Sequence, residues 1–451
     1  MTESGKLKLP HPLALLTGCV LLAAAASYVL PAGEFDRRDD PVTGRTLVVP
    51  GTYQAVESNP VNIFEALVAL PRGMADAGSV IFLVFLIGGA FTVVDQTGAL
   101  RRAIPSLIRA LRGRDLLIVP VVSLFFAMGG VVQNMQEEII PLIPVLMILV
   151  GRMGFTPLVA VAMSAGSAFV GSAFSPINPF QVIIAQQAAE VEPISGALFR
   201  IVFLVLALAL WIGATMRYAA ATRTAQQGTV EEELGESMTE IDTVVIGMVA
   251  ATFMLMVIGL RSWGWGFDQM SGAFFLMGCL VGLIAKMGIG GTAEAYVKGF
   301  REMAYAALLI GFARAISTVL ADGRIIDTIV NGMFTPLESL PQFASALGMV
   351  VGQALLHVPV PSVSGQAVLT MPILVPLADL LGLSRQVIVL AYQYGAGLCD
   401  LVTPTNGALM AILASAGVRY EQWMKFTAPL YLGLVALGCL SIGIAITIGL
   451  Q

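Results

Sequence analysis

Two proline–asparagine motifs interrupt otherwise apolar segments of the chain. The first reads SPINP at residues 175–179 and the second reads TPTNG at residues 403–407. Proline cannot donate a backbone hydrogen bond, so each motif would break a helix and leave backbone groups free. Free helix N-termini favour carboxylates, and free carbonyl oxygens favour cations. We therefore predict a binding site for a small solute or ion, lined by Ser175, Asn178, Thr403, Thr405 and Asn406.

The two motifs occupy equivalent positions in an internal repeat. Asn406 follows Asn178 by 228 residues, and at this offset 11 positions between 144 and 190 carry identical residues. Ordinary proline kinks would explain each motif alone, but they would not explain the shared register. The repeat therefore favours the binding-site interpretation. A sodium ion near Asn178 and Asn406 is one candidate occupant.

Each repeat also contains a pair of short apolar runs separated by polar residues. The separators are residues 133–138 in the first repeat and residues 358–365 in the second. Because the runs fall well short of the ~20 residues that cross a bilayer, each pair is predicted to form a re-entrant hairpin with a polar tip. Aqueous loops are the alternative. The tip residues expected near the helix breaks are Asn134, Glu137, Glu138, Ser362, Ser364 and Gly365.

Three further residues place charge or a titratable group inside apolar segments. Asp400 stands three residues before the second motif, Arg314 lies within an apolar run, and His357 precedes the second tip. Such groups are costly in lipid and usually serve a function. Asp400 could bind substrate or an ion, and His357 could carry a proton. A structural salt bridge for Arg314 and a buried, hydrogen-bonded role for His357 remain open alternatives.

The elements that must position these residues are membrane helices. Of the 451 residues, 57% are hydrophobic and 12% are charged, and the mean hydropathy is +0.86. A soluble domain carries about twice this charged fraction. The composition predicts an all-α polytopic membrane protein in the inner membrane. It gives no indication of nucleic-acid binding, of a cofactor or of a definite metal site. Two histidines and four dispersed cysteines are too few for an obvious metal cluster.

The pattern of apolar runs predicts four regions and nine crossings. Residues 1–78 would hold the first transmembrane helix, an external loop and an interfacial helix. Residues 79–218 would form the first repeat, 219–303 a cytoplasmic linker with two connecting helices, and 304–451 the second repeat. With the N-terminus inside, 15 Lys and Arg residues fall inside and 7 outside, as the positive-inside rule requires. The two repeats would then have opposite topology, and the C-terminus would be outside.

Several motifs resemble the YfcC family, which is related to anaerobic C4-dicarboxylate carriers and arginine/ornithine antiporters. They are SVSGQAVLTMP at 362–372, PLAD at 376–379, TPTNG at 403–407, EEIIP at 137–141 and LPAGEF at 30–35. The resemblance implies the ion-transporter superfamily fold, with two re-entrant hairpins and elevator-type alternating access. Other members of that superfamily carry Ser-Asn-Thr motifs where this chain has SPIN and TPTN. Sodium coupling is therefore not implied. We also expect a homodimer.

The sequence thus predicts a secondary transporter of a small carboxylate-bearing solute, driven by H⁺, Na⁺ or a counter-substrate. An ion or solute channel and a non-transporting membrane scaffold are the alternatives, and no enzyme is expected. Half-helix N-termini and Arg314 could bind a carboxylate, while Glu137, Glu138 and Asp400 could receive a cation. An amino acid with a cationic end would satisfy both sets. We therefore place amino acids slightly ahead of C4-dicarboxylates.

Overall fold

The computed structural model describes residues 11–40, 45–49, 51–99, 102, 115–224 and 238–450. Two segments of the sequence analysis lie largely outside these residues. They are the basic stretch between residues 101 and 114, of which Arg102 is described, and the middle of the acidic linker at 225–237. Seven described helical segments are long and apolar enough to cross a membrane. The chain is therefore an all-α, multi-pass membrane protein.

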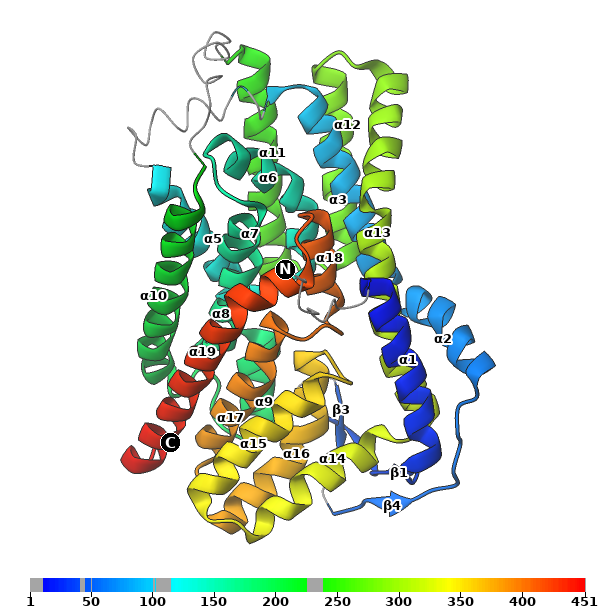
Figure 1. Ribbon diagram of the computed structural model, residues 1–451, viewed down its shortest axis with the longest axis vertical. Helices are drawn as coiled ribbons and strands as arrows, with labels where there is room; N and C mark the ends of the chain where they lie inside the picture. Colours follow the sequence, from blue (N-terminus) through cyan, green and yellow to red (C-terminus); the bar gives the residue numbers. More distant parts are fainter. Residues whose placement is uncertain are drawn as a thin grey trace, which may run out of the picture.

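One group of helices packs around α3, and we call it the first bundle (Figure 1). Gly299 allows a close crossing, because a Cβ there would lie 2.6 Å from the Cα of Gly89. Such small residues let membrane helices approach closely. The members are α1 (Pro12–Val29), α2 (Ile63–Asp76), α3 (Gly78–Gln96), α11 (Glu240–Ser262), α12 (Phe267–Ile284) and α13 (Gly288–Asp322).

The first repeat supplies half of a second bundle. The helix pair is α5 (Ile118–Gln133) followed by η2 (Glu137–Leu142) and α6 (Ile143–Arg152). The broken helix runs through α7 (Pro157–Val161), the π-helical η3 (Ala162–Gly166) and α8 (Ser167–Ala173). It resumes as the π-helical η4 (Pro179–Ile183) and α9 (Ile184–Ala188). The long helix α10 (Ala197–Thr222) then packs beside α8.

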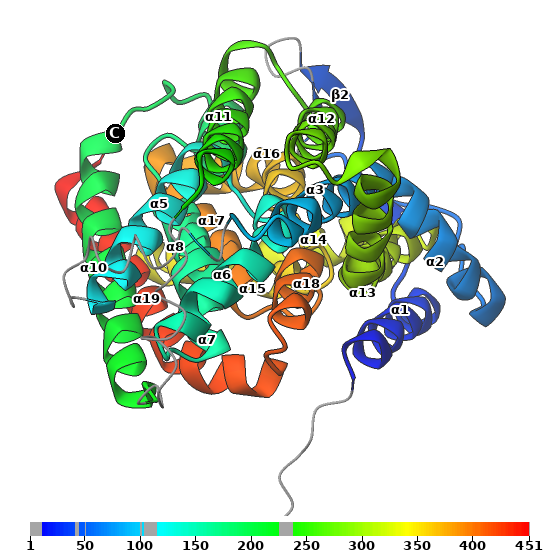
Figure 2. The same cartoon turned by 90° about the horizontal axis from the view of Figure 1, so that it is seen from above.

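The second repeat supplies the other half of the second bundle in the same order. Its part of the second bundle starts with α14 (Ile326–Phe334) and η6 (Thr335–Ser339). The helix pair is α15 (Gln342–His357) and α16 (Val363–Leu381). The broken helix is α17 (Arg385–Gly397) with η7 (Leu398–Leu401), then α18 (Gly407–Ser415), and α19 (Tyr420–Ile448) follows. In both views α18 lies beside α13, so the second break faces the first bundle (Figures 1 and 2).

Some element boundaries differ from the sequence-based expectations. The boundary expected at residue 304 lies inside the 35-residue α13, which begins at Gly288. The turn expected at 358–365 is shorter, because α16 begins at Val363 and includes Ser364 and Gly365 in its first turn. One arm of each helix pair, Asp115–Val132 and Val363–Leu381, is longer than expected and is long and apolar enough to cross a membrane. The polar segment after α1 forms two small antiparallel sheets. In these, β1 (Gly33–Glu34) pairs with β4 (Gln54–Ala55), and β2 (Arg37–Asp40) pairs with β3 (Arg45–Val48).

Candidate functional site

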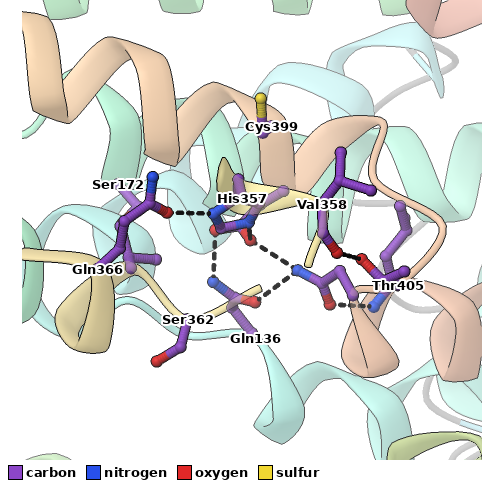
Figure 3. A network of polar contacts seen from close by, with 12 residues as sticks. Gln136, Ser172, His357, Val358, Ser362, Gln366, Cys399 and Thr405 are labelled. Carbon is purple, nitrogen blue, oxygen red and sulfur yellow. Dashed lines mark hydrogen bonds and ion pairs between the residues drawn. The ribbon is translucent and has the colours of Figure 1, made fainter. Parts of the chain in front are cut away.

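Four interruptions of the helices meet inside the second bundle (Figure 3). Two are the breaks, residues 174–178 and 402–406. Two are the tips of the helix pairs, which we define as residues 134–136 for the first and 358–362 for the second. Asn134 ends α5 in the left-handed conformation, with φ of 56°. Each break is held by hydrogen bonds from side chains of the predicted site.

Asn178 and Ser175 attach the first break to the end of α5. The Nδ2 of Asn178 donates to the carbonyl oxygen of Gly130 at 2.7 Å, and the Oγ of Ser175 donates to that of Val131 at 2.8 Å. The Oδ1 of Asn178 accepts from the backbone N–H of Gln181 at 3.0 Å. This side chain therefore joins the backbone of α5 to the first turn after the break.

Asn406 and Thr405 make similar hydrogen bonds at the second break. The Oδ1 of Asn406 accepts from the backbone N–H of Leu409 at 2.9 Å, which caps α18. The Oγ1 of Thr405 donates to the carbonyl oxygen of Val358 at 2.5 Å. At the 228-residue offset, Leu409 is the equivalent of Gln181 and Val358 is the equivalent of Gly130. Equivalent carbonyl oxygens and equivalent capping contacts therefore hold the two breaks, although Asn178 donates at the first and Thr405 at the second.

Asp400 is the charged centre of the second break, and it is only 1% exposed. Its Oδ1 lies 3.0 Å from the Nε2 of His357 and accepts from the Nδ2 of Asn406 at 2.7 Å. Its Oδ2 accepts from the Nε2 of Gln136 at 2.8 Å. Gln136 belongs to the first tip, and His357 ends α15 just before the second tip. Both helix pairs thus converge on this single carboxylate (Figure 3).

The first break has a hydroxyl where the second has this carboxylate. Ser172 is equivalent to Asp400 at the 228-residue offset. Its Oγ donates to the Oδ1 of Asn134 and accepts from the Nδ2 of Asn178 at 3.2 Å. The predicted residues Asn134, Ser175 and Asn178 are therefore brought together at the first break, in a neutral setting.

Two more acids lie next to Asp400 at the start of η2. Glu138 is 9% exposed, and its Oε2 accepts from the backbone N–H of Gln136 at 3.1 Å. Glu137 is partly buried and lies within electrostatic reach of Asp400. Three carboxyl groups thus cluster near one histidine. No group of His, Cys, Asp or Glu in the described part of the chain could hold a metal ion.

The remaining predicted residues lie around this centre. Ser362 caps α16 by accepting from the backbone N–H of Gly365 at 3.3 Å, and Ser364 is partly exposed in the same turn. Thr403 is buried within the second break. Arg314 is exposed on α13, one turn after Ile310, whose Cα would lie 2.9 Å from a Cβ at Gly407. Residues four apart share a helix face, so Arg314 stands on the side of α13 that meets the start of α18.

Neutral glutamines complete the site, and sequence reasoning missed them. Gln366 contacts His357 and lies at the position equivalent to Glu138, so the repeat offset was an available signal. Its Nε2 donates to the carbonyl oxygen of Gln353 at 2.6 Å. Gln353 in turn donates to the Oγ1 of Thr370 at 2.7 Å. These residues extend the polar network from the second break into the second helix pair.

Arg200 is a second component that sequence reasoning did not place. It is fully buried on α10 and donates to the Oε1 of Gln386 at 2.8 Å and of Gln393 at 3.1 Å. Gln393 donates in turn to the carbonyl oxygen of Ser175 at 2.8 Å. This chain of contacts ties α10 and α17 to the first break.

A multi-pass helical protein with two capped helix breaks and a buried polar centre between them belongs to the class of membrane transporters. Comparison with known proteins agrees with this class. The chain belongs to the C4-dicarboxylate anaerobic carrier family DcuC, whose model matches residues 9–447. It is a transporter and not an enzyme.

Two relatives match over most of their length. One is 30% identical, covers 95% of this chain and 94% of its own, and is named "Putative basic amino acid antiporter YfcC" in Escherichia coli (strain K12). The other is an uncharacterized protein of Haemophilus influenzae (strain ATCC 51907 / DSM 11121 / KW20 / Rd). It is 29% identical over 90% of this chain and 83% of its own.

Two solved structures are also similar. The YdaH transporter of Alcanivorax borkumensis has a TM-score of 0.46 at 18% identity, over 98% of this chain and 99% of its own. MtrF of Neisseria gonorrhoeae, from a class of antimetabolite efflux pumps, has a TM-score of 0.42 at 17% identity. That match covers 98% of this chain and 96% of MtrF.

Proposed function

We propose that this transporter is a secondary active carrier of the inner membrane that moves a small carboxylate-bearing solute. The observation that carries the proposal is the convergence of two tips and two breaks on one buried polar centre. Interrupted helices inside a membrane are tolerated where they line a binding site. The helix pairs act as re-entrant hairpins, and the two repeats have opposite topology.

The proposed movement is of the elevator type. The helices of the first bundle pack mainly on one another, and the hairpins and broken helices of the second bundle do the same. Contacts of α18 with α13 and of η2 with α3 join the two bundles close to the site. The second bundle would slide against the first as a unit and carry the solute with it.

Charge supports an amino acid with a cationic end as the solute. Glu137, Glu138 and Asp400 give the centre a surplus of acidic groups. Among the described residues, His357 is the one basic side chain that contacts Asp400. Arg314 and the N-terminus of α18 would receive the carboxylate. The name of the Escherichia coli relative supports this solute class, whereas the family description supports a C4-dicarboxylate.

The test compares solutes in proteoliposomes that contain the purified protein. Binding and counterflow of arginine, ornithine, succinate and a neutral amino acid are measured for the wild type and for Asp400→Asn. If Asp400 pairs with a cationic end, the substitution weakens arginine binding by about 2–5 kcal/mol and spares succinate. The control is Asp379→Asn, which removes an exposed carboxylate of α16 that pairs with Arg385.

Two outcomes would contradict this proposal. Tight succinate binding without amino-acid binding would reverse the preferred solute class and make the acids coupling-ion ligands. A solute flux that shows no counterflow and does not saturate would indicate a channel.

A further inference from the structure

Both ring nitrogens of the fully buried His357 face oxygen atoms. Its Nε2 lies 3.0 Å from the Oδ1 of Asp400, and its Nδ1 lies 3.0 Å from the Oε1 of Gln366 (Figure 3). A neutral imidazole has one donor nitrogen and one acceptor nitrogen, whereas an imidazolium has two donors. The protonation of this ring therefore follows from whether the two oxygens can donate.

The amide of Gln366 is fixed with its oxygen toward the ring. Its Nε2 lies 2.6 Å from the backbone carbonyl oxygen of Gln353, which can only accept a hydrogen bond. Turning the amide over would place two oxygens against each other. The Oε1 of Gln366 is therefore an acceptor, and the Nδ1 of His357 must carry a proton to bond with it.

Donors likewise surround Asp400. The backbone N–H of Leu409 holds the Oδ1 of Asn406, which turns the Nδ2 of that asparagine toward the carboxylate. The Nε2 of Gln136 points at the other carboxylate oxygen. An ionised carboxylate only accepts and satisfies all three of these contacts, so we assign Asp400 no proton, and the Nε2 of His357 then also donates. The geometry is that of an imidazolium beside a carboxylate.

The elements around the pair contribute few other charges. Glu137 and Glu138 approach from η2, and both are acids. From η7 and α19 come the neutral thiol of Cys399 and its partner Tyr431. The α16 helix contributes the neutral Gln366 and Thr370, and α18 contributes Asn406. Among these described neighbours of the pair, none is a basic side chain.

We propose that His357 and Asp400 form the proton-binding site of this protein, that the structure is its proton-loaded state, and that the proton is exchanged for the cationic end of the solute. Loading adds one proton from solvent water to a ring nitrogen, release returns it to water, and no other covalent bond changes. After release, one ring nitrogen of His357 carries no proton, and it faces an oxygen atom of Gln366 or of Asp400. The contact between the second hairpin and the second break then weakens, and Asp400 is left to pair with another cation. The exchange rests on the proposed function, whereas the proton site does not.

The proton site can be tested without a substrate. The chain has two histidines, His11 and His357, so ¹⁵N-histidine labelling gives two ring signals, and His357→Gln assigns them by loss. We expect the His357 ring to carry protons on both nitrogens near pH 7 in the wild type and on one nitrogen in Asp400→Asn. A neutral His357 ring in the wild type, or an imidazolium that persists in Asp400→Asn, would overturn the proposal. Ser345→Ala, which changes a buried hydroxyl at the other end of α15, is the control.

The coupling role is tested by flux in proteoliposomes. In His357→Gln, arginine uptake driven by a pH gradient should fall to the level of protein-free vesicles, while arginine–arginine exchange continues. Gradient-driven uptake that survives this substitution would overturn the coupling role. If the wild type moves none of the solutes, the proposed function fails, and the ring signals still decide the proton site. If His357→Gln does not fold, His11→Gln assigns the ring signals by loss, Asp400→Asn still decides the proton site, and His357→Asn replaces His357→Gln in the flux measurement.

Discussion

Asn178 and Asn406 each replace backbone partners that a helix break removes. Each side chain accepts from a backbone N–H three positions later, at 3.0 Å and 2.9 Å. Each also donates to the residue six positions earlier, which is Ser172 in one repeat and Asp400 in the other. Because these bonds lie in buried surroundings, losing one partner leaves the other unsatisfied.

Replacing either asparagine should abolish transport while the protein remains folded. Asn178→Ala and Asn406→Ala each leave buried groups unpaired, at a cost of about 1–3 kcal/mol for each group. The position of the break, and with it the site, then changes. The measurement is solute uptake into proteoliposomes, together with size-exclusion chromatography of the purified variants.

A matched control is Asn331→Ala on α14, which removes an asparagine side chain outside the two breaks. It should retain uptake. If both Asn178→Ala and Asn406→Ala transport at the wild-type rate, the breaks have no part in binding.

The charged and proline-bounded residues of the site could be predicted from the sequence, because such groups are rare in apolar segments. His357 and Asp400 could be predicted only as two separate residues, and not as members of one centre. Gln136, which donates to Asp400 from the first tip, lies 264 positions before it. Glutamine is neutral and carries no local signal. Gln136, Gln353 and Gln366 acquire their roles through contacts between distant elements, which a single sequence does not reveal.

Glycines set how closely the helices of the second bundle approach each other. A Cβ at Gly171 on α8 would lie 2.4 Å from the carbonyl oxygen of Ala127 on α5. A Cβ at Gly395 on α17 would lie 2.6 Å from the carbonyl oxygen of Val350 on α15. In each repeat, a helix of the hairpin therefore presses its backbone against the broken helix.

Adding a methyl group at this contact should destabilise the protein. Gly171→Ala forces α5 and α8 apart, and overpacking of this kind costs about 1–3 kcal/mol. The measurement is thermal unfolding of the detergent-solubilised protein. Gly213→Ala in the middle of α10 is the control, because a Cβ there meets nothing within 4 Å. Equal unfolding temperatures for the two variants would contradict the tight packing of α5 and α8.

Element boundaries were less predictable than element order. The boundary expected at residue 304 is no helix end, because α13 continues through it with Glu294, Lys298 and Arg301 exposed along the helix. The glycine pair at 129–130 lies inside α5, which continues to Gln133 with Gly130 packed against Ala168. The strands after α1 depend on pairing between segments whose sequences show no alternation of apolar and polar residues. Tertiary contact decided each of these cases.

Topology is a property of the whole molecule, and the positive-inside rule predicts it. A reporter fused after Arg223 should be cytoplasmic, and one fused at Gln451 should be external. Nine crossings with an inside N-terminus require this result. Compartment-specific activity of the two fusions is the measurement. A cytoplasmic reporter at Gln451 would exclude the nine-crossing arrangement, and with it the opposite topology of the two repeats.

The two repeats share a backbone plan but differ in charge at one equivalent position, Ser172 in the first and Asp400 in the second. A solute held between them would meet a hydroxyl on one side and a carboxylate on the other. Its two ends would therefore have unlike surroundings, and one of its two possible orientations would have the lower energy. A molecule whose ends are the same could not use that difference. The near-symmetry of the frame would thus give the proposed site a direction, and that direction would favour solutes with a distinct head and tail.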